Sequence, residues 1–136
     1  MPFKGADIIV LGEVHDNPTH HANQARIVAE LKPQALVFEM ITPDVARQVT
    51  PELRENAARL EAVLGWRASG WPDFAMYYPI FTAAPEAAIF GGAVPRDTVR
   101  QAISESAAAA FGASAPLFGL DRPLPEDQRA ARLELQ

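Results

Sequence analysis

The succession of apolar and amphipathic segments near the start of the chain constrains the fold most strongly. An apolar run at Asp7–Leu11 is followed by an amphipathic stretch that ends at Leu31, and a second apolar run covers Ala35–Phe38. Short apolar runs closed by Gly or a charged residue are typical of buried strands. A strand, a helix and a strand in succession predict a parallel pair with a right-handed crossover. The chain is therefore expected to be an α/β protein with three layers, α/β/α, and a mainly parallel sheet.

Proline and capping residues mark further elements along the chain. Helices are expected to begin at Pro18 after a cap at Asp16 or Asn17, at Pro43 after Thr42, and at Pro51 after Thr50, the last of these ending at Gly65. A further helix is expected after Trp71–Asp73, interrupted at Pro79. The last two are expected over Asp97–Ala110 and Glu126–Gln136. A third strand is expected at Ala87–Gly91, and Gly112–Pro125 resembles a linker. Three strands make a small sheet, since a typical sheet has about five. We therefore expect a single α/β domain over residues 1–136 that is incomplete, its sheet being completed by further sequence or by a partner chain.

Composition excludes several classes of function. The net charge of −5 argues against nucleic acid as the main partner, because phosphate binding needs a basic surface. The absence of cysteine excludes disulfides, zinc–thiolate sites, iron–sulfur clusters and cysteine nucleophiles. No apolar run is long enough to span a bilayer, and no signal peptide is visible, because Lys4 precedes only a short apolar run.

All three histidines lie within ten residues that follow the first expected strand. These are His15, His20 and His21, in the segment Gly12–His21. Ligands bind beyond the carboxyl ends of strands in open α/β sheets. If strand geometry persists, Glu13 and His15 point to the same side. A carboxylate beside an imidazole suits acid–base catalysis, metal ligation or the orientation of a ligand-binding histidine; the alternative is that Glu13 caps a helix or pairs with an arginine.

The adjacent histidines of the following helix diverge by about a third of a turn, so His20 and His21 cannot chelate one ion as an i,i+4 pair would. One is expected to face a pocket and the other a second layer or solvent, unless both are ordinary surface histidines. Glu39 closes the second expected strand as Glu13 closes the first, so the two carboxylates should lie side by side and share a proton or bind a cation. Arg96, just past the third strand, is a candidate for that cation; the alternatives are a surface salt bridge or a residue at the start of a helix.

Aromatic residues gather between positions 66 and 81. Phe74, Tyr77 and Phe81 share one helix face, and this spacing is more often part of a core than a ligand platform. A functional interpretation requires a flat apolar ligand, or a phenolate bound to ferric iron as in haem ligation by tyrosine.

Four motifs, taken in order, resemble the ChaN family of bacterial haem-binding proteins. They are Gly12-Glu13-x-His15-Asp16-Asn17 with His20-His21-x-x-Gln24, then Val37-Phe38-Glu39-Met40, then Gly70-Trp71-Pro72-x-x-x-x-Tyr77-x-Pro79-Ile80-Phe81, and then Gly91-x-x-Val94-Pro95-Arg96. The resemblance covers residues 7 to about 100. Family members continue past the length of this chain, which again points to an incomplete domain.

The resemblance implies an α/β fold and a role in haem or iron uptake. Characterised members are iron-regulated lipoproteins, so the periplasm or the outer membrane is the implied location. They bind two haems face to face in a dimer, through tyrosine with histidine nearby. The residues that the resemblance places at the haem are His15, His20, His21, Tyr77, Tyr78 and Arg96, with Tyr77 as the iron ligand.

The family is related to erythromycin esterases and to TraB/TIKI proteins, which share the element from Gly12 to His15. That relation keeps open a hydrolase, metal-dependent or based on histidine and glutamate, in which Glu13, His15 and Glu39 act as catalytic groups. A third possibility is a fragment that retains the core of the fold without its function.

Overall fold

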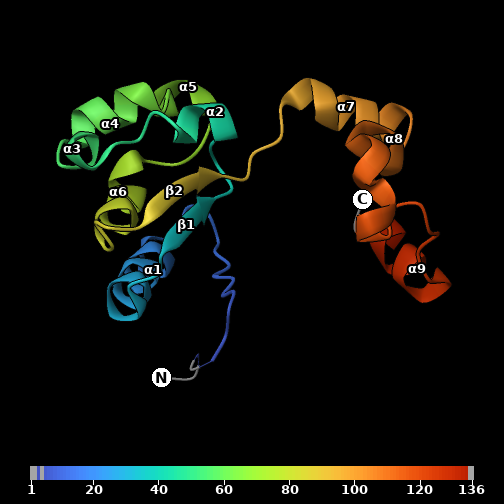
Figure 1. Ribbon diagram of the computed structural model, residues 1–136, viewed down its shortest axis with the longest axis horizontal. Coiled ribbons are helices and arrows are strands. Elements are labelled where there is room, and N and C mark those ends of the chain that lie inside the picture. The colour runs from blue at the N-terminus through green and yellow to red at the C-terminus, as the bar shows by residue number, and fades with distance from the viewer. Residues whose placement is uncertain (1–2, 4, 135–136) are drawn as a thin grey trace. The chain divides into compact units, whose positions relative to one another are not determined.

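The computed structural model describes residue 3 and residues 5–134, and it confirms a mixed α/β fold (Figure 1). The chain divides after Ala93 into two units, which are treated separately below. The N-terminal unit contains α1 (Pro18–Leu31), β1 (Ala35–Phe38), α2 (Pro43–Ala46), α3 (Pro51–Arg54), α4 (Ala57–Val63), α5 (Trp66–Ser69), α6 (Phe74–Thr82) and β2 (Ala88–Gly91). The C-terminal unit contains α7 (Arg96–Ser104), α8 (Ala107–Phe111), the 3₁₀ helix η1 (Gly112–Phe118) and α9 (Glu126–Glu134).

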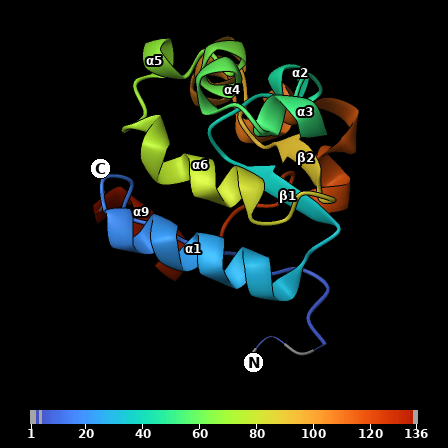
Figure 2. The same cartoon turned by 90° about the vertical axis from the view of Figure 1, so that its left-hand side faces the viewer.

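The sheet consists of two parallel strands, β1 and β2, among the residues described. Their register pairs Ala35 with Ala88 and Phe38 with Gly91. Helix α6 lies between α1 and α4, with both strands beside it (Figures 1 and 2). Phe38 of β1 stacks on Phe81 of α6 with ring centroids 3.9 Å apart, so the buried side of the sheet packs on α6.

The strand expected at Asp7–Leu11 does not form, which corrects the prediction of three strands. The segment has no strand hydrogen bonds, and Ile8 and Val10 are 84% and 89% exposed. An apolar run is a local property, whereas a strand also needs a neighbour that accepts its ladder of hydrogen bonds. Here the backbone carbonyl of Leu11 accepts a hydrogen bond from the side chain of Gln24 on α1 instead, at 3.1 Å.

Capping side chains define where several helices begin. Asn17, Thr42 and Thr50 accept backbone N–H groups at the starts of α1, α2 and α3, which confirms the expected starts. The single helix expected from Thr50 to Gly65 is wrong, because Asn56 accepts the Arg59 N–H at 3.0 Å and begins a separate helix, α4.

Two further expectations about helices need correction. Ser106 caps α8 in the same way, so the helix expected over Asp97–Ala110 is two helices. Pro79 lies inside α6 without interrupting it. Helix α9 confirms the last expected helix through Glu134, and residues 135–136 lie outside the described part.

A buried arginine joins α3 to the turn that leads into β2. The Arg54 side chain is 6% exposed, and its guanidinium donates to the carbonyls of Phe81, Ala84 and Ala87 at 3.1–3.3 Å. The backbone carbonyl of Arg54 accepts a hydrogen bond from the Tyr78 hydroxyl at 2.9 Å. These bonds satisfy carbonyls in the last turn of α6 and in the segment that leads to β2, so they hold α6 and β2 in a set relation.

The C-terminal unit buries little of itself. Among its described residues only Ala115 is fully buried, and Phe111 packs edge-on against Phe118 at 5.0 Å. Within the two described stretches of the chain, no helix combines the length and apolarity needed to cross a membrane.

Candidate functional site

A buried carboxylate organises the polar residues between α1 and α6. The side chain of Glu13, 9% exposed, accepts at Oε1 the Tyr77 hydroxyl at 2.8 Å and His15 Nδ1 at 2.9 Å. Its Oε2 accepts Gln24 Nε2 at 3.0 Å and lies 3.3 Å from His21 Nδ1. These five residues are called the Glu13 cluster below.

Helix geometry explains why the cluster assembles. His21 and Gln24 are three residues apart on α1, so they share the face that packs on α6. Tyr77 comes from the buried face of α6, and its ring lies 4.1 Å from that of His21. The loop that precedes α1 carries Glu13 and His15, whose side chains meet at 2.9 Å although no strand forms there.

His15 is the cluster's exposed member. Its side chain is 48% exposed, and its ring meets the Trp71 indole edge-on at 4.8 Å. Because Nδ1 faces the Glu13 carboxylate, the neutral ring carries its hydrogen there. The lone pair is then on Nε2, as in a metal-binding histidine that a carboxylate orients.

His21 is the cluster's buried histidine, with 1% exposure. Its Nε2 donates to the carbonyl of His15 at 2.8 Å. Its Nδ1 lies 3.3 Å from both Gln24 Oε1 and Glu13 Oε2. Each of these partners can accept a hydrogen bond.

The cluster shifts two ionisation equilibria. Burial disfavours the Glu13 carboxylate, but the hydrogen bonds from His15, Tyr77 and Gln24 and the nearby His21 outweigh burial and lower the pKa of Glu13. Burial raises the pKa of the Tyr77 phenol well above its ordinary range, and its hydrogen bond to Glu13 and the negative charges of Glu13 and Glu39 raise it further. Tyr77 is therefore a neutral donor and Glu13 an ionised acceptor near neutral pH.

The other residues expected at the site lie elsewhere. His20 accepts the Val14 backbone N–H at Nδ1, at 2.9 Å, and so supports the loop next to the cluster. Glu39 is exposed just past β1 and acts on Tyr77 through its charge. Tyr78 points to Arg54 instead, and Arg96 belongs to the C-terminal unit.

Two residues in the site were not assigned a role from the sequence, Gln24 and Trp71. Gln24 was visible as a polar residue on the apolar face of α1, three residues after His21, and that is the signal that could have identified it. Trp71 was visible only as part of an aromatic-rich segment, because its contact with His15 depends on the tertiary fold.

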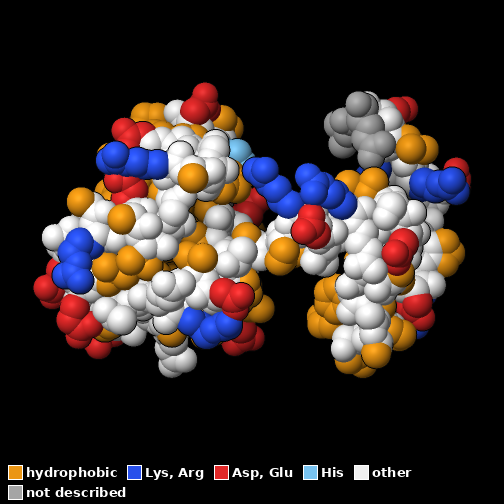
Figure 3. All heavy atoms as spheres, turned by 90° about the horizontal axis from the view of Figure 1, so that it is seen from above, with side chains coloured by type: hydrophobic (Ala, Val, Ile, Leu, Met, Phe, Trp, Pro, Cys, Tyr) orange, Lys and Arg blue, Asp and Glu red, His pale blue; other side chains and the backbone are white. Residues whose placement is uncertain are grey.

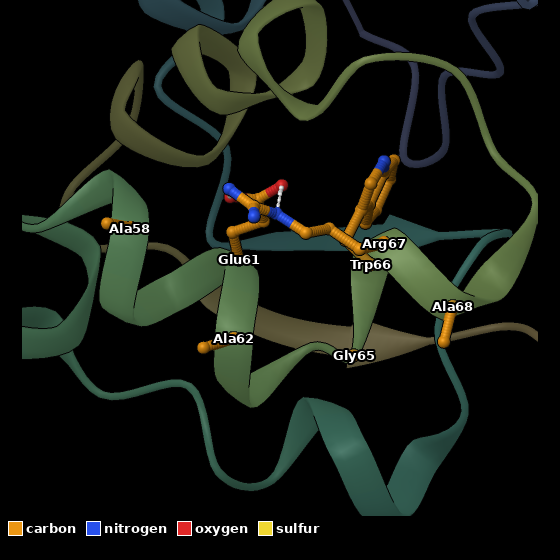
Figure 4. A pocket seen from close by; sticks show the side chains of 7 residues that line it. All are labelled: Ala58, Glu61, Ala62, Gly65, Trp66, Arg67 and Ala68. Carbon is orange, nitrogen blue, oxygen red and sulfur yellow. Dashed lines mark hydrogen bonds and ion pairs between the residues drawn. The ribbon is translucent and has the colours of Figure 1, made fainter.

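The N-terminal unit has two hollows. One, of about 350 Å³, is lined by Phe3, Val10, Leu11, Gly12, His20, Asn23, Gln24 and Ile27. The other, of about 400 Å³, is lined by Ala58, Glu61, Ala62, Gly65, Trp66, Arg67 and Ala68, and Arg67 pairs with Glu61 beside it at 3.1 Å (Figure 4).

The residues described include no group of three histidine, aspartate or glutamate side chains that could hold a metal ion.

Comparison with known proteins identifies a family. A protein-family model described as haem-binding uptake, Tiki superfamily, ChaN, matches residues 2–136. Neither the curated proteins nor the solved structures provide a match.

Proposed function

The chain belongs to the ChaN family of haem-binding uptake proteins in the Tiki superfamily, and on that premise we propose that it binds haem at the Glu13 cluster. The observation that carries the proposal is the exposed His15 ring, whose Nδ1 donates to Glu13 and whose Nε2 has no hydrogen-bond partner among the described residues. A carboxylate behind the imidazole sets the orientation of the ring. The neighbouring Trp71 adds a flat apolar surface of the kind that a porphyrin contacts.

Tyr77 and His15 differ in how readily each could ligate the haem iron. Tyr77 is fully buried, and its hydroxyl is bonded to Glu13, so iron ligation by Tyr77 requires α1 and α6 to separate and the phenol to lose a proton. Iron ligation by His15 requires neither of these changes. We propose His15 as the residue that first meets the iron, and ligation by Tyr77 stays a prediction from the family resemblance. When bound, haem would supply the ferric iron that such a ligand recognises.

Titration of the full chain with hemin tests the proposal. We expect a Soret shift that is saturable in the wild type and an affinity at least tenfold lower in His15→Ala, with Tyr78→Phe as the control. An affinity lost in Tyr77→Phe but kept in His15→Ala would move the ligand from histidine to tyrosine. A wild-type protein that gives no Soret shift would contradict haem binding.

Dimerisation around stacked haems also stays a prediction. Size-exclusion chromatography of the chain with and without hemin tests it, because the resemblance predicts a doubled mass only with hemin. An unchanged elution volume in saturating hemin would contradict the stacked dimer.

The pair of His15 and Glu13 favours hydrolysis as a second candidate function. An imidazole whose Nδ1 donates to a carboxylate can take a proton from water at Nε2, as a general base does. Turnover of p-nitrophenyl esters by the wild type, lost in His15→Ala, is the expected result. If turnover persists in His15→Ala or never appears, this candidate fails.

A further inference from the structure

Gln24 is one of two residues, with His21, through which α1 contacts the rest of the Glu13 cluster. Its side chain is 9% exposed, and its amide nitrogen donates both to the carbonyl of Leu11 at 3.1 Å and to Glu13 Oε2 at 3.0 Å. Its amide oxygen lies 3.3 Å from His21 Nδ1. The backbone of Leu11 and the side chain of Glu13 are thus both bonded to the side chain of Gln24.

The orientation of the Gln24 amide follows from its partners. A carbonyl and a carboxylate can only accept hydrogen bonds, so both require the NH₂ end. The oxygen must then face His21, and the opposite orientation would place it against Leu11 and Glu13, two other acceptors. Glu13 is therefore held from behind by Gln24 at Oε2 while its Oε1 faces His15 and Tyr77.

We propose that Gln24 is a positioning residue for the ligand-binding histidine, a proposal that rests on the proposed function. By fixing the Glu13 carboxylate, Gln24 keeps the hydrogen of the His15 ring on Nδ1 and the lone pair on Nε2. Gln24 touches no ligand itself, because it is buried beneath Glu13 and acts only through that carboxylate.

The sharpest test is Gln24→Glu, which keeps the size of the side chain and an oxygen toward His21 but removes both donations. Asn23→Asp is the matched control, because it makes the same chemical change at the exposed neighbouring position on α1. Nitrogen-15 NMR of the imidazole rings, on the full chain without haem at pH 8, reports which nitrogen of His15 carries hydrogen. His15→Ala assigns the signal.

We expect the wild type and Asn23→Asp to show His15 with hydrogen on Nδ1, and Gln24→Glu to show a mixture with the Nε2–H form. Hemin affinity should fall tenfold to a hundredfold in Gln24→Glu alone, the usual effect of losing a partner behind a metal ligand. A folded Gln24→Glu protein with the wild-type His15 signal would overturn the proposal. If circular dichroism shows that Gln24→Glu is unfolded, Gln24→Met takes its place with the same two outcomes.

The two proposals fail in different ways. Absence of hemin binding by the wild type contradicts the proposed function, while the tautomer comparison, made without haem, still decides the role of Gln24. Normal hemin binding together with an unchanged His15 signal in Gln24→Glu contradicts the role of Gln24 alone.

Discussion

Glu13 is the residue on which the candidate site depends, because its two oxygens accept from Tyr77, His15 and Gln24 and face His21. The bonds from Gln24 and Tyr77 come from distant parts of the chain. They fix the loop that carries Glu13, which is not part of a strand. A carboxylate with this many donors is stabilised in its ionised form. Burial of Tyr77 and, after it, the hydrogen bond to ionised Glu13 keep the phenol neutral.

The lowered pKa of Glu13 predicts how stability depends on pH. The unfolded chain binds a proton at Glu13 more readily than the folded chain, so the contribution of Glu13 is present above its ordinary pKa of 4.5 and is lost as pH falls through the folded value. In Glu13→Gln we expect stability about 2 kcal/mol lower at pH 7 and a weaker dependence on pH below 4.5. Urea unfolding at pH 3 to 7 measures both. Equal slopes in the two proteins would contradict the assignment.

The raised pKa of Tyr77 makes a prediction at high pH. The folded chain keeps the phenol proton above pH 10, where the unfolded chain releases it, so this group lowers stability as pH rises beyond 10. The chain has two tyrosines, Tyr77 and Tyr78. Absorbance at 295 nm should show that Tyr77 ionises only as the protein unfolds, by comparison of the wild type with Tyr77→Phe. A Tyr77 signal that titrates while circular dichroism stays native would count against its hydrogen bond to Glu13.

At the scale of elements, close backbone contact explains the glycine that ends β2. A Cβ added to Gly91 would collide with the backbone of Ile41 and Thr42, whereas one added to Gly92 would make ordinary contacts of 3.5 Å or more. Gly91→Ala should therefore cost about 1–3 kcal/mol, as overpacking does, and Gly92→Ala much less. Thermal unfolding of the two variants checks this, and equal melting temperatures would show that the loop after β1 can yield.

The corrections to the expected helices belong to the same scale. Asn56 and Ser106 each divide a helix that the apolar pattern alone predicts to be continuous, because an asparagine or serine side chain that accepts a backbone N–H begins a new helix. Arg54 shows the opposite effect, since a single buried guanidinium joins elements far apart in sequence. The sequence pattern identified Arg54 only as one residue of a helix.

At the scale of the whole molecule, the two units differ in how much they bury. The N-terminal unit holds a continuous apolar core around Tyr77, Phe81 and Leu60, while among the described residues of the C-terminal unit only Ala115 is fully buried. In the space-filling view, apolar side chains reach the surface among charged ones in both units (Figure 3).

This difference predicts unequal protection of the backbone. Segments with few buried contacts open at little cost in free energy. In hydrogen-exchange mass spectrometry we expect amides of residues 96–134 to exchange at least tenfold faster than those of α1 and α6. Uniform protection across the chain would show that the C-terminal helices are stabilised by contacts beyond their own unit.

Much of the fold could be read from the sequence, because the signals involved are local. The caps at Asn17, Thr42 and Thr50 and the apolar runs that became β1 and β2 depend on residues that are close neighbours in the chain. The family resemblance likewise rested on short motifs, and the family match confirms it. Of the site, the divergence of His20 from His21 was predictable for the same reason.

Only the tertiary structure decided what the first apolar run does and what surrounds Glu13. Whether residues 7–11 pair with a strand depends on a neighbouring edge, and which side chains reach Glu13 depends on contacts across 11 residues to Gln24 and 64 residues to Tyr77. Periodicity and capping carry no information about such distances. The sequence by itself therefore determined the strands β1 and β2, the starts of several helices, the family and the chemical groups available. The packing of α1 against α6 decided which of those groups contact Glu13.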